Sequence, residues 1–357
     1  MNILMASLVY CLAGSNAGST AEFGNETGLH LLRCDTDSGK IEIVETVSNE
    51  VGTTYFQWIE GGSRVISAGS HFDAENKRHG ALRSFRFGGD KLSKGETLAI
   101  LPCETPCHVA VSSDEKKVAF AAYSSGTVGV YDMVSGKLQT RVLPNDAMGP
   151  RKDRQQKAYA HCAFFFPDEE NVAGFVDLGC DRIVFFNLDD MSPLPEMELK
   201  FQPGDGPRHV VISCDGKFMY VVNELSSSVV AFKRDGRRFT VIDRKSIVPE
   251  ATSVFTTKAA AIKLSADGKI LMASNRGEDS IAFFDVRDDG TLSHRGISKL
   301  TGSFPRDFEL MPGGKFMVVG HKMSNEIAVY SFNKDKATIE RVGDVLKVWR
   351  PLCFKFK

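Results

Sequence analysis

Short runs of β-branched and aromatic residues, separated by turn-forming residues, dominate the pattern of hydrophobic positions along this chain. The clearest example lies in residues 206–232, where two such runs flank the turn Cys-Asp-Gly-Lys and a third follows Glu-Leu-Ser-Ser-Ser. Short apolar runs with turn residues between them predict β-strands joined by hairpins. The segment is therefore expected to form a strand, a tight turn, a second strand, a short loop and a third strand.

The same arrangement recurs along the chain. Further copies have their turns near residues 62, 115, 169, 268 and 314, and the copy near residue 62 is the weakest, with an insertion at residues 71–79. Successive turns are about 50 residues apart, which leaves room for a fourth strand, for example at residues 139–143 and 239–243. A four-stranded unit repeated at this period is typical of a β-propeller blade. Six blades are visible in this way.

The two ends of the chain supply a seventh blade. Residues 351–356 resemble a first strand, and residues 8–14, 28–33 and 41–47 resemble a second, a third and a fourth strand. Pairing them would close the ring and remove its exposed edges. We therefore predict an all-β fold: a seven-bladed β-propeller, formed by residues 1–357 as a single domain, whose last blade combines one C-terminal strand with three N-terminal strands.

Charge and cysteine content exclude several classes of function. The chain has 44 basic and 45 acidic residues without a long run of either sign, so neither nucleic acid nor a membrane is expected as a partner. Its eight cysteines are scattered without a Cys-x-x-Cys motif, which predicts neither a zinc cluster nor a dense disulfide framework. Most of them resemble small hydrophobic residues on strands, and a reducing, cytoplasmic location fits best.

Other motifs are weak or missing. Residues 1–14 are apolar, but no Lys or Arg precedes the apolar run, so a strand is favoured over a signal peptide. We find no dinucleotide fingerprint, phosphate-binding loop or serine-hydrolase elbow. We expect neither a cofactor nor a metal, because no group of ligand residues has metal-binding spacing.

Propeller geometry predicts where polar side chains should meet. In each blade the first strand lines the central channel, and the start of the first strand lies on the same face as the end of the second. The residues at these positions are His108, His161, Arg208, His209, Arg306 and Asp307 at first strands, and Tyr123, Asp177, Glu224, Arg276 and His321 at second strands. Polar residues that converge on one rim are typical of a small-molecule site.

Some of these residues also have a purely structural interpretation. His108 and His209 come one residue after the position that opens the strand, so alternation could turn them into the blade, where the backbone would satisfy them. Asp181 and Arg182 are expected to lie in a solvated turn.

Several segments together resemble the seven-bladed propeller lactonases, which include the propeller type of 6-phosphogluconolactonase and fungal carboxy-cis,cis-muconate cyclase. The resemblance covers essentially the whole chain and is carried by Pro106-Cys107-His108, Gly206-Pro207-Arg208-His209, Val221-Val222-Asn223-Glu224-Leu225, Ala273-Ser274-Asn275-Arg276-Gly277 and residues 351–356. It implies a catalytic group of His161, Arg208, Glu224 and Arg276. The neighbouring candidates for substrate binding are His108, Tyr123, Arg306 and His321. Two positions depart from the family pattern: Tyr159 replaces the first histidine of a His-x-His, and Gly320-His321 replaces an Ala-Asn.

The resemblance implies hydrolysis of a small anionic sugar lactone, most simply 6-phosphogluconolactone to 6-phosphogluconate, by a monomer or weak homo-oligomer. Arg208 and Arg276 would hold the anionic substrate and the developing oxyanion. His161 or Glu224 would act as the general base, and nearby guanidinium groups argue against Glu224 as an acid. Two alternatives stay open: a muconate-type cycloisomerase using the same four residues, and a non-catalytic interaction scaffold.

Overall fold

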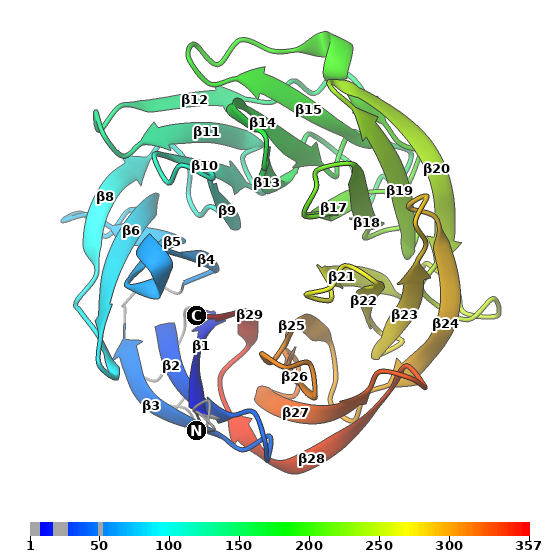
Figure 1. Cartoon of the computed structure of the whole chain (residues 1–357). Helices are drawn as coiled ribbons and strands as arrows, with labels where there is room; N and C mark the ends of the chain where they lie inside the picture. The colour runs from blue at the N-terminus through cyan, green and yellow to red at the C-terminus, as the bar shows by residue number, and fades with distance from the viewer. Residues whose placement is uncertain (1–7, 17–27, 49–52) are drawn as a thin grey trace.

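Seven antiparallel sheets stand around a central channel in the computed structural model, which describes residues 8–16, 28–48 and 53–357 (Figure 1). The predicted seven-bladed β-propeller is thereby confirmed. Residues 1–7, on which part of the signal-peptide question depends, lie outside the described residues.

Each blade is a meander that runs outward from the channel. The first two blades contain β4 (Tyr55–Ile59), β5 (Arg64–Phe72), β6 (Arg78–Gly88), β7 (Lys91–Leu92) and β8 (Glu96–Leu101), and then β9 (His108–Val111), β10 (Lys117–Ala122), β11 (Thr127–Asp132) and β12 (Leu138–Val142). The third contains β13 (Ala160–Phe166), β14 (Glu169–Asp177), β15 (Arg182–Asn187) and β16 (Leu199–Lys200). Two short 3-10 helices, η1 (Glu60–Gly62) and η2 (Pro195–Met197), lie in connections of the first and third blades.

The next three blades follow the same order. They consist of β17 (Pro207–Ile212), β18 (Phe218–Asn223), β19 (Ser228–Asp235) and β20 (Arg238–Ser246); of β21 (Lys258–Leu264), β22 (Ile270–Arg276), β23 (Ser280–Val286) and β24 (Leu292–Lys299); and of β25 (Pro305–Leu310), β26 (Phe316–His321), β27 (Glu326–Asn333) and β28 (Thr338–Lys347).

The seventh blade joins the two ends of the chain, as predicted. It contains β29 (Pro351–Phe356), β1 (Leu8–Ser15), β2 (Gly28–Asp35) and β3 (Ile41–Ser48), in that order from the channel. Strand β1 pairs with β29 through Gly14 opposite Cys353 and with β2 through Gly14 opposite Leu29. Consecutive first strands touch all the way round, including β29 against both β25 and β4. The ring is therefore closed by strand pairing rather than by loop contacts.

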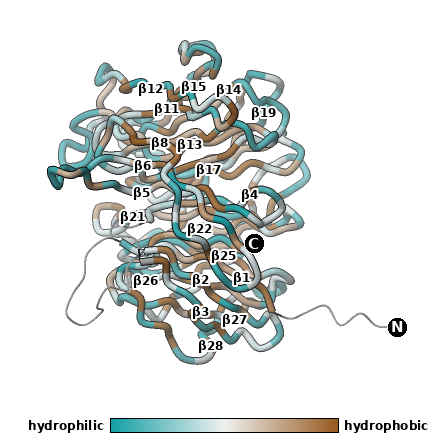
Figure 2. Tube along the Cα trace, turned by 90° about the vertical axis from the view of Figure 1, so that its left-hand side faces the viewer, coloured by the Kyte–Doolittle hydropathy of each residue, from teal (hydrophilic) through white to brown (hydrophobic). Residues whose placement is uncertain are grey.

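The apolar core lies between neighbouring blades. Each of its clusters combines residues of two adjacent sheets; one, for example, packs Tyr220 and Val222 of β18 against Leu271 and Ala273 of β22. Figure 2 shows hydrophobic residues concentrated along the strands and hydrophilic residues in the loops. Four cysteines behave as the small hydrophobic residues that the sequence predicts, because they are buried on strands: Cys11, Cys34, Cys162 and Cys353.

The closing strand offers a direct test of this architecture. Cys353 is fully buried in β29, so a Cys353→Ser variant places a hydroxyl in an apolar environment. We expect it to lower the free energy of unfolding by about 1–3 kcal/mol in urea titrations. The exposed Cys214 provides the matched control, and Cys214→Ser should change stability by less than about 0.5 kcal/mol. Equal stabilities for the two variants would contradict the buried position of β29.

One structural expectation is wrong. Asp181 and Arg182 are not in a solvated turn, because their exposed fractions are 6% and 4%. The loop of residues 143–159 and the loop of residues 201–206 cover them. Asp181 accepts hydrogen bonds from the backbone nitrogens of Gly204 and Gly206, at 2.7 Å each, and thereby holds the segment that leads into Arg208.

None of the helical segments in the described part of the chain has the length and apolar character of a bilayer-spanning helix.

Candidate active site at the channel mouth

Three first strands are irregular at the positions that carry candidate side chains. His161 lies between the regular pairs Ala160–Asp177 and Cys162–Val176, and Arg208 between Pro207–Asn223 and His209–Val222. The third interruption falls at Arg306 in β25. An extra, unpaired residue of this kind turns its side chain away from the strict alternation of the strand. The bulges thus direct His161, Arg208 and Arg306 toward the mouth of the channel.

Glu224 is the centre of this group. It follows directly after β18 and is only 3% exposed. Its Oε2 lies 3.1 Å from Nε of Arg208 and 2.7 Å from Nη2 of Arg276, while its Oε1 lies 2.5 Å from Nη2 of Arg154. One buried carboxylate therefore pairs with three guanidinium groups from three separate segments of the chain. The structure brings together the four residues that the family resemblance implies, because His161 Nε2 also lies 4.0 Å from Glu224 Oε2.

The charges of the group keep Glu224 ionised. Burial alone would raise the pKa of its carboxyl, but Arg276 and Arg208, with smaller contributions from His161 and Arg154, hold that pKa well below its usual value. The same crowding of cations, after burial, lowers the pKa of Arg208 to about 9, so its guanidinium is still protonated at neutral pH. Glu224 is consequently an anchor for cations and not a proton donor.

His161 is neutral in this environment. Burial, followed by the nearby Arg208 cation, lowers the pKa of its imidazole well below 6.5. The proton of a neutral imidazole is favoured on Nε2, which faces the Glu224 anion. Nδ1 is then an acceptor, and it is buried without a hydrogen-bond partner among the described residues. A neutral histidine with a free acceptor nitrogen can accept a proton from a water molecule.

Further cationic side chains lie around this group and have no carboxylate as an ion-pair partner within the described residues. In the described part of the chain, no carboxylate lies within ion-pair distance of Arg306, Lys322 or Lys258, and all three are half-buried. Burial and then the charge of Arg306 lower the pKa of Lys322 to about 8. Arg306 itself has its pKa lowered by burial and then by Arg276. The mouth thus carries an excess of positive charge, which suits an anionic ligand.

Tyr123 borders the same group. Its ring stacks on Tyr159 at a centroid distance of 4.6 Å and meets the edge of His161 at 5.2 Å. Its hydroxyl oxygen accepts a hydrogen bond from Nη2 of Arg154 at 3.3 Å. Tyr159, at the position where the family has a histidine, therefore forms part of the aromatic wall of the site.

His108 lies deeper in the channel than the group formed by His161, Arg208, Glu224 and Arg276. Strand β9 has no bulge, and His108 pairs in regular register with Ala121. Its ring contacts Tyr55 at 3.9 Å between centroids and His209 at 5.2 Å, and its Nε2 lies 3.5 Å from Sγ of Cys162. The backbone nitrogen of Ala163 also donates to its Nδ1. His108 and His209 therefore face the lower channel rather than the interior of a blade.

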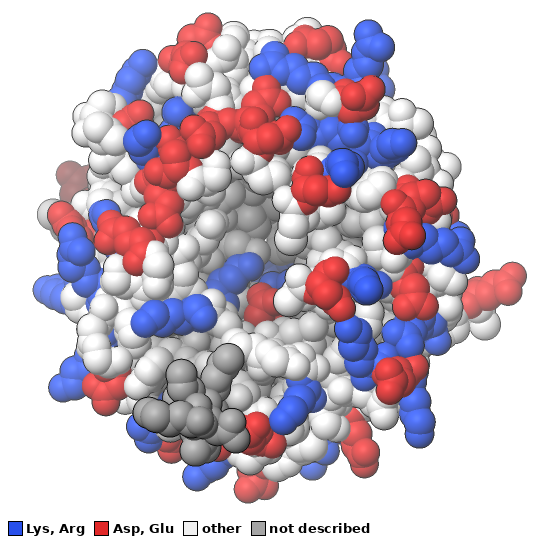
Figure 3. All heavy atoms as spheres, viewed as in Figure 1, with Lys and Arg blue, Asp and Glu red and all other residues white. Residues whose placement is uncertain are grey.

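A cavity of about 280 Å³ occupies this lower part of the channel. Residues of the first strands line it, including His108, Gln57, Phe165, Ile212 and Lys355. Figure 3 shows that the centre of the ring is hollowed, with basic and acidic side chains together at the edge of the hollow. Ion pairs in this region include Lys263 with Glu309 at 2.6 Å. Charged side chains thus line the channel beyond the group that Glu224 forms with Arg154, Arg208 and Arg276.

His321 corrects one prediction. It was expected to face the substrate, but it is fully buried within its own blade, where its Nε2 lies 2.9 Å from the hydroxyl of Tyr330. Its ring also packs so closely on Gly302 that a side chain there would collide with it. The reason is the strand alternation at the end of β26, which turns this side chain onto a face of the sheet and away from the channel.

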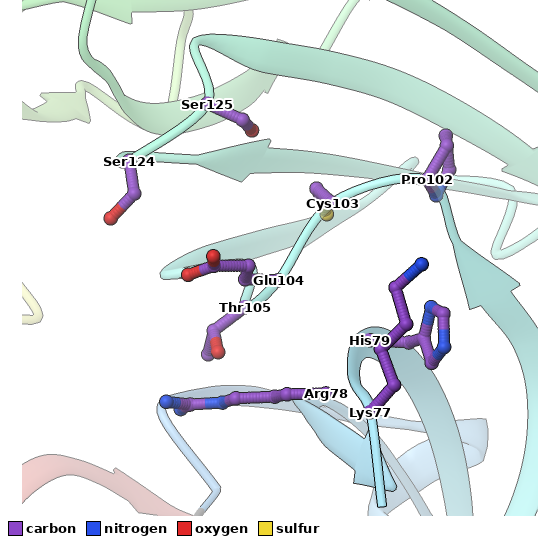
Figure 4. Close-up of a pocket in the computed structure, with 9 residues that line it drawn as sticks. All are labelled: Lys77, Arg78, His79, Pro102, Cys103, Glu104, Thr105, Ser124 and Ser125. Carbon is purple, nitrogen blue, oxygen red and sulfur yellow. The ribbon is translucent and has the colours of Figure 1, made fainter. Parts of the chain in front are cut away.

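A second pocket lies beside the mouth. The insertion in the weak first repeat forms the hairpin of β5 and β6, and the resulting cavity of about 400 Å³ is lined by Lys77, Arg78, His79, Pro102, Cys103, Glu104, Thr105, Ser124 and Ser125. Figure 4 shows Arg78 and Glu104 extending to the same side from two segments of the chain, with Thr105 between them. Ser70 links these segments, because its Oγ accepts from Nε of Arg78 and also bonds to Thr105. The insertion therefore builds a polar pocket next to the loop that follows Tyr123.

Among the described residues, no group of three or more His, Cys, Asp or Glu side chains is arranged to hold a metal ion. The side chains gathered at the mouth are those of arginine, lysine, histidine and tyrosine around the carboxylate of Glu224.

Three residues of the site were missed from the sequence: Arg154, Lys258, which opens β21, and Lys322. Arg154 lies in the loop between β12 and β13, and Lys322 follows β26, so neither belongs to the strand positions on which the prediction depended. The only signal for Arg154 was the basic composition of residues 151–157, which is equally typical of a solvated loop.

Comparison with known proteins gives a consistent family assignment. The model of the family described as "Lactonase, 7-bladed beta-propeller" matches residues 14–356. An uncharacterized protein of Staphylococcus saprophyticus is 31% identical over 340 residues, covering 92% of this chain and 95% of its own. An uncharacterized protein of Staphylococcus aureus is 34% identical over 258 residues, covering 71% of this chain and 75% of its own.

Solved structures agree over the whole chain. A Bacteroides fragilis protein provisionally assigned as a 6-phosphogluconolactonase superposes with a TM-score of 0.83 at 27% identity, covering 100% of both chains. One from Bacteroides uniformis with the same provisional assignment gives a TM-score of 0.83 at 29% identity, covering 98% of this chain and 100% of the other. The periplasmic gluconolactonase of Pseudomonas aeruginosa shares the fold, with a TM-score of 0.85 at 24% identity over 98% and 99% of the two chains.

Proposed function

The chain belongs to the seven-bladed β-propeller lactonase family, and on that premise we propose that it hydrolyses a sugar-derived lactone carrying a negative charge, with 6-phosphogluconolactone as the first candidate substrate. The observation that carries this proposal is the charge imbalance at the channel mouth. Among the residues that the structure describes, Glu224 alone pairs with Arg154, Arg208 and Arg276, and further cations lie nearby without a carboxylate partner. A phosphorylated lactone would supply the missing negative charge.

Hydrolysis at this site would begin with water. Neutral His161 accepts a proton from a water molecule through its free Nδ1, and the water oxygen attacks the carbonyl carbon of the lactone. Negative charge develops on the carbonyl oxygen, where guanidinium groups stabilise it. The ring C–O bond then breaks, and the departing oxygen takes the proton back from His161. The products are a hydroxyl group and a carboxylic acid, which releases its proton to solvent.

The residues around Glu224 have separate tasks in this scheme. Glu224 is ionised, but its carboxylate oxygens are already paired with arginines, so we assign the role of general base to His161. The role of Glu224 is to hold Arg208 and Arg276 in position. Nη2 of Arg208 and Nη1 of Arg276 donate to no group among the described residues, which leaves both available to substrate oxygens. Tyr123 and Arg306 would contact the remote part of the substrate.

The depressed pKa of His161 predicts the pH dependence of the reaction. A base acts in its neutral form, which predominates above its pKa, and here burial and Arg208 lower that pKa. We therefore expect kcat/KM, corrected for spontaneous hydrolysis, to stay constant from about pH 7.5 down to the ordinary histidine value of about 6.5 and to fall only below it. An acid limb with its midpoint above pH 6.5 would contradict His161 as the base.

The direct test of the function is an assay with purified protein. The formation of 6-phosphogluconate from 6-phosphogluconolactone should exceed the spontaneous rate, and unphosphorylated glucono-δ-lactone should be hydrolysed with a lower kcat/KM. A protein that hydrolyses neither lactone would refute the proposal. Conversion of a carboxylated muconate without lactone hydrolysis would point instead to a cycloisomerase.

A further inference from the structure

Arg154 is held in place by a rigid part of an otherwise irregular loop. Its neighbour Gln155 is 1% exposed and donates from Nε2 to the carbonyl oxygen of Leu178 at 2.9 Å and to Oδ1 of Asp181 at 2.8 Å. Oε1 of Gln155 accepts from the backbone nitrogen of Arg151, and Oδ1 of Asn145 accepts from that of Ala158. The two bonds from Nε2 tie the loop to the third blade directly after Arg154, and the other two bonds fasten the loop to itself on both sides of Arg154. Its guanidinium is therefore preorganised over the channel mouth.

The guanidinium uses only one of its terminal nitrogens. Nη2 meets both Glu224 Oε1, at 2.5 Å, and the hydroxyl of Tyr123, at 3.3 Å. Nη1 is buried and has no hydrogen-bond partner among the described residues. A buried charged donor without a partner is costly, and a ligand atom that accepts a hydrogen bond from Nη1 would remove this cost.

Arg154 is also the outermost of the three arginines on Glu224. Its side chain is 20% exposed, against 2% for Arg208 and 6% for Arg276. The other two guanidinium groups share Oε2 of Glu224, and both donate to backbone carbonyl oxygens of β21. Arg154 alone is bound to Oε1, on the side of the group that lies nearest to solvent. An entering ligand therefore meets Arg154 before it meets the other two.

We propose that Arg154 is a further substrate-binding residue, whose free Nη1 donates a hydrogen bond to the carbonyl oxygen at which the negative charge develops. This inference rests on the proposed lactone hydrolysis. Two buried polar atoms of this group have no hydrogen-bond partner among the described residues: Nη1 of Arg154, a donor, and Nδ1 of His161, an acceptor. Attack of water on a carbonyl group needs one of each: an acceptor for the proton of the water and a donor for the oxyanion.

The test compares two replacements of Arg154 with a matched control. Arg154→Gln removes the charge, and Arg154→Lys keeps a cation that can reach Glu224 but has no second, planar donor. Arg151→Gln is the control, because Arg151 lies on the same loop and also pairs with a carboxylate, that of Asp153. We expect both Arg154 variants to lower kcat by about 10²-fold with a smaller change in KM, and the control to leave both constants unchanged.

Binding of the product 6-phosphogluconate, measured by calorimetry, separates this inference from the proposed function. Its carboxylate stands where the lactone carbonyl was, so both Arg154 variants should bind it at least about 10-fold more weakly than the wild type and the control. Wild-type kcat and wild-type product affinity in Arg154→Lys would overturn the role of Arg154 while lactone hydrolysis stands. If the wild type hydrolyses no lactone, the proposed function and this inference fall together. An Arg154→Gln variant that fails to fold leaves the decision to Arg154→Lys.

Discussion

Replacing Arg208 with alanine is expected to lower kcat/KM for lactone hydrolysis by about 10²- to 10³-fold while the propeller stays folded. Arg208 is 1% exposed and aimed at the channel mouth by the bulge in β17. It pairs with Glu224 and donates from Nη1 to the carbonyl oxygen of Ala260 at 2.6 Å, so its orientation is set before any substrate arrives. The fold should survive because Glu224 keeps Arg276 and Arg154 as partners.

The measurement is steady-state kinetics alongside thermal unfolding. Arg237→Ala serves as the control, because Arg237 also pairs with a glutamate, Glu169, but lies exposed and away from the channel. It should leave kcat/KM unchanged. Normal hydrolysis of 6-phosphogluconolactone by a folded Arg208→Ala protein would show that the arginine group is not the site of the reaction.

Replacing Glu224 with glutamine is expected to cost about 3–5 kcal/mol of stability and most of the activity. Glutamine has nearly the same shape, but it removes the carboxylate charge that, within the described part of the chain, alone pairs with Arg154, Arg208 and Arg276. Three buried guanidinium groups would then repel one another without compensation. Inorganic phosphate in the buffer should restore part of the lost stability, because it can supply the missing anion.

The dependence of this loss on pH follows from the depressed pKa of Glu224. A carboxyl whose pKa is lower in the folded state than in the unfolded state stabilises the fold above its ordinary pKa of 4.5 and loses this effect as the pH falls toward the lowered value. The difference in unfolding free energy between the wild type and Glu224→Gln should therefore be largest at neutral pH and shrink below pH 4.5. A difference that is constant over this range, in urea titrations at several pH values, would contradict an ionised Glu224.

The sequence alone determined the architecture, because it depends on periodicities that are local. Alternating apolar runs, turns at a period of about 50 residues, one extra strand at the C-terminus and three at the N-terminus were sufficient to predict seven blades and their closure. The same topology placed Arg208 at the start of a first strand and Glu224 and Arg276 at the ends of second strands, on one face. Antiparallel pairing places the start of a first strand beside the end of the second strand, independently of the length and sequence of the loops.

Only the tertiary structure decided where each side chain points. Strand alternation predicts a direction only for regular strands, and bulges at His161, Arg208 and Arg306 override it, whereas His108 and His321 follow the regular pairing and leave the group. Arg154 comes from a loop without periodicity, so its approach to Glu224 depends on the hydrogen bonds of Gln155 with residues far away in sequence. Contacts of this kind are set by packing between blades, and no local pattern in the sequence encodes them.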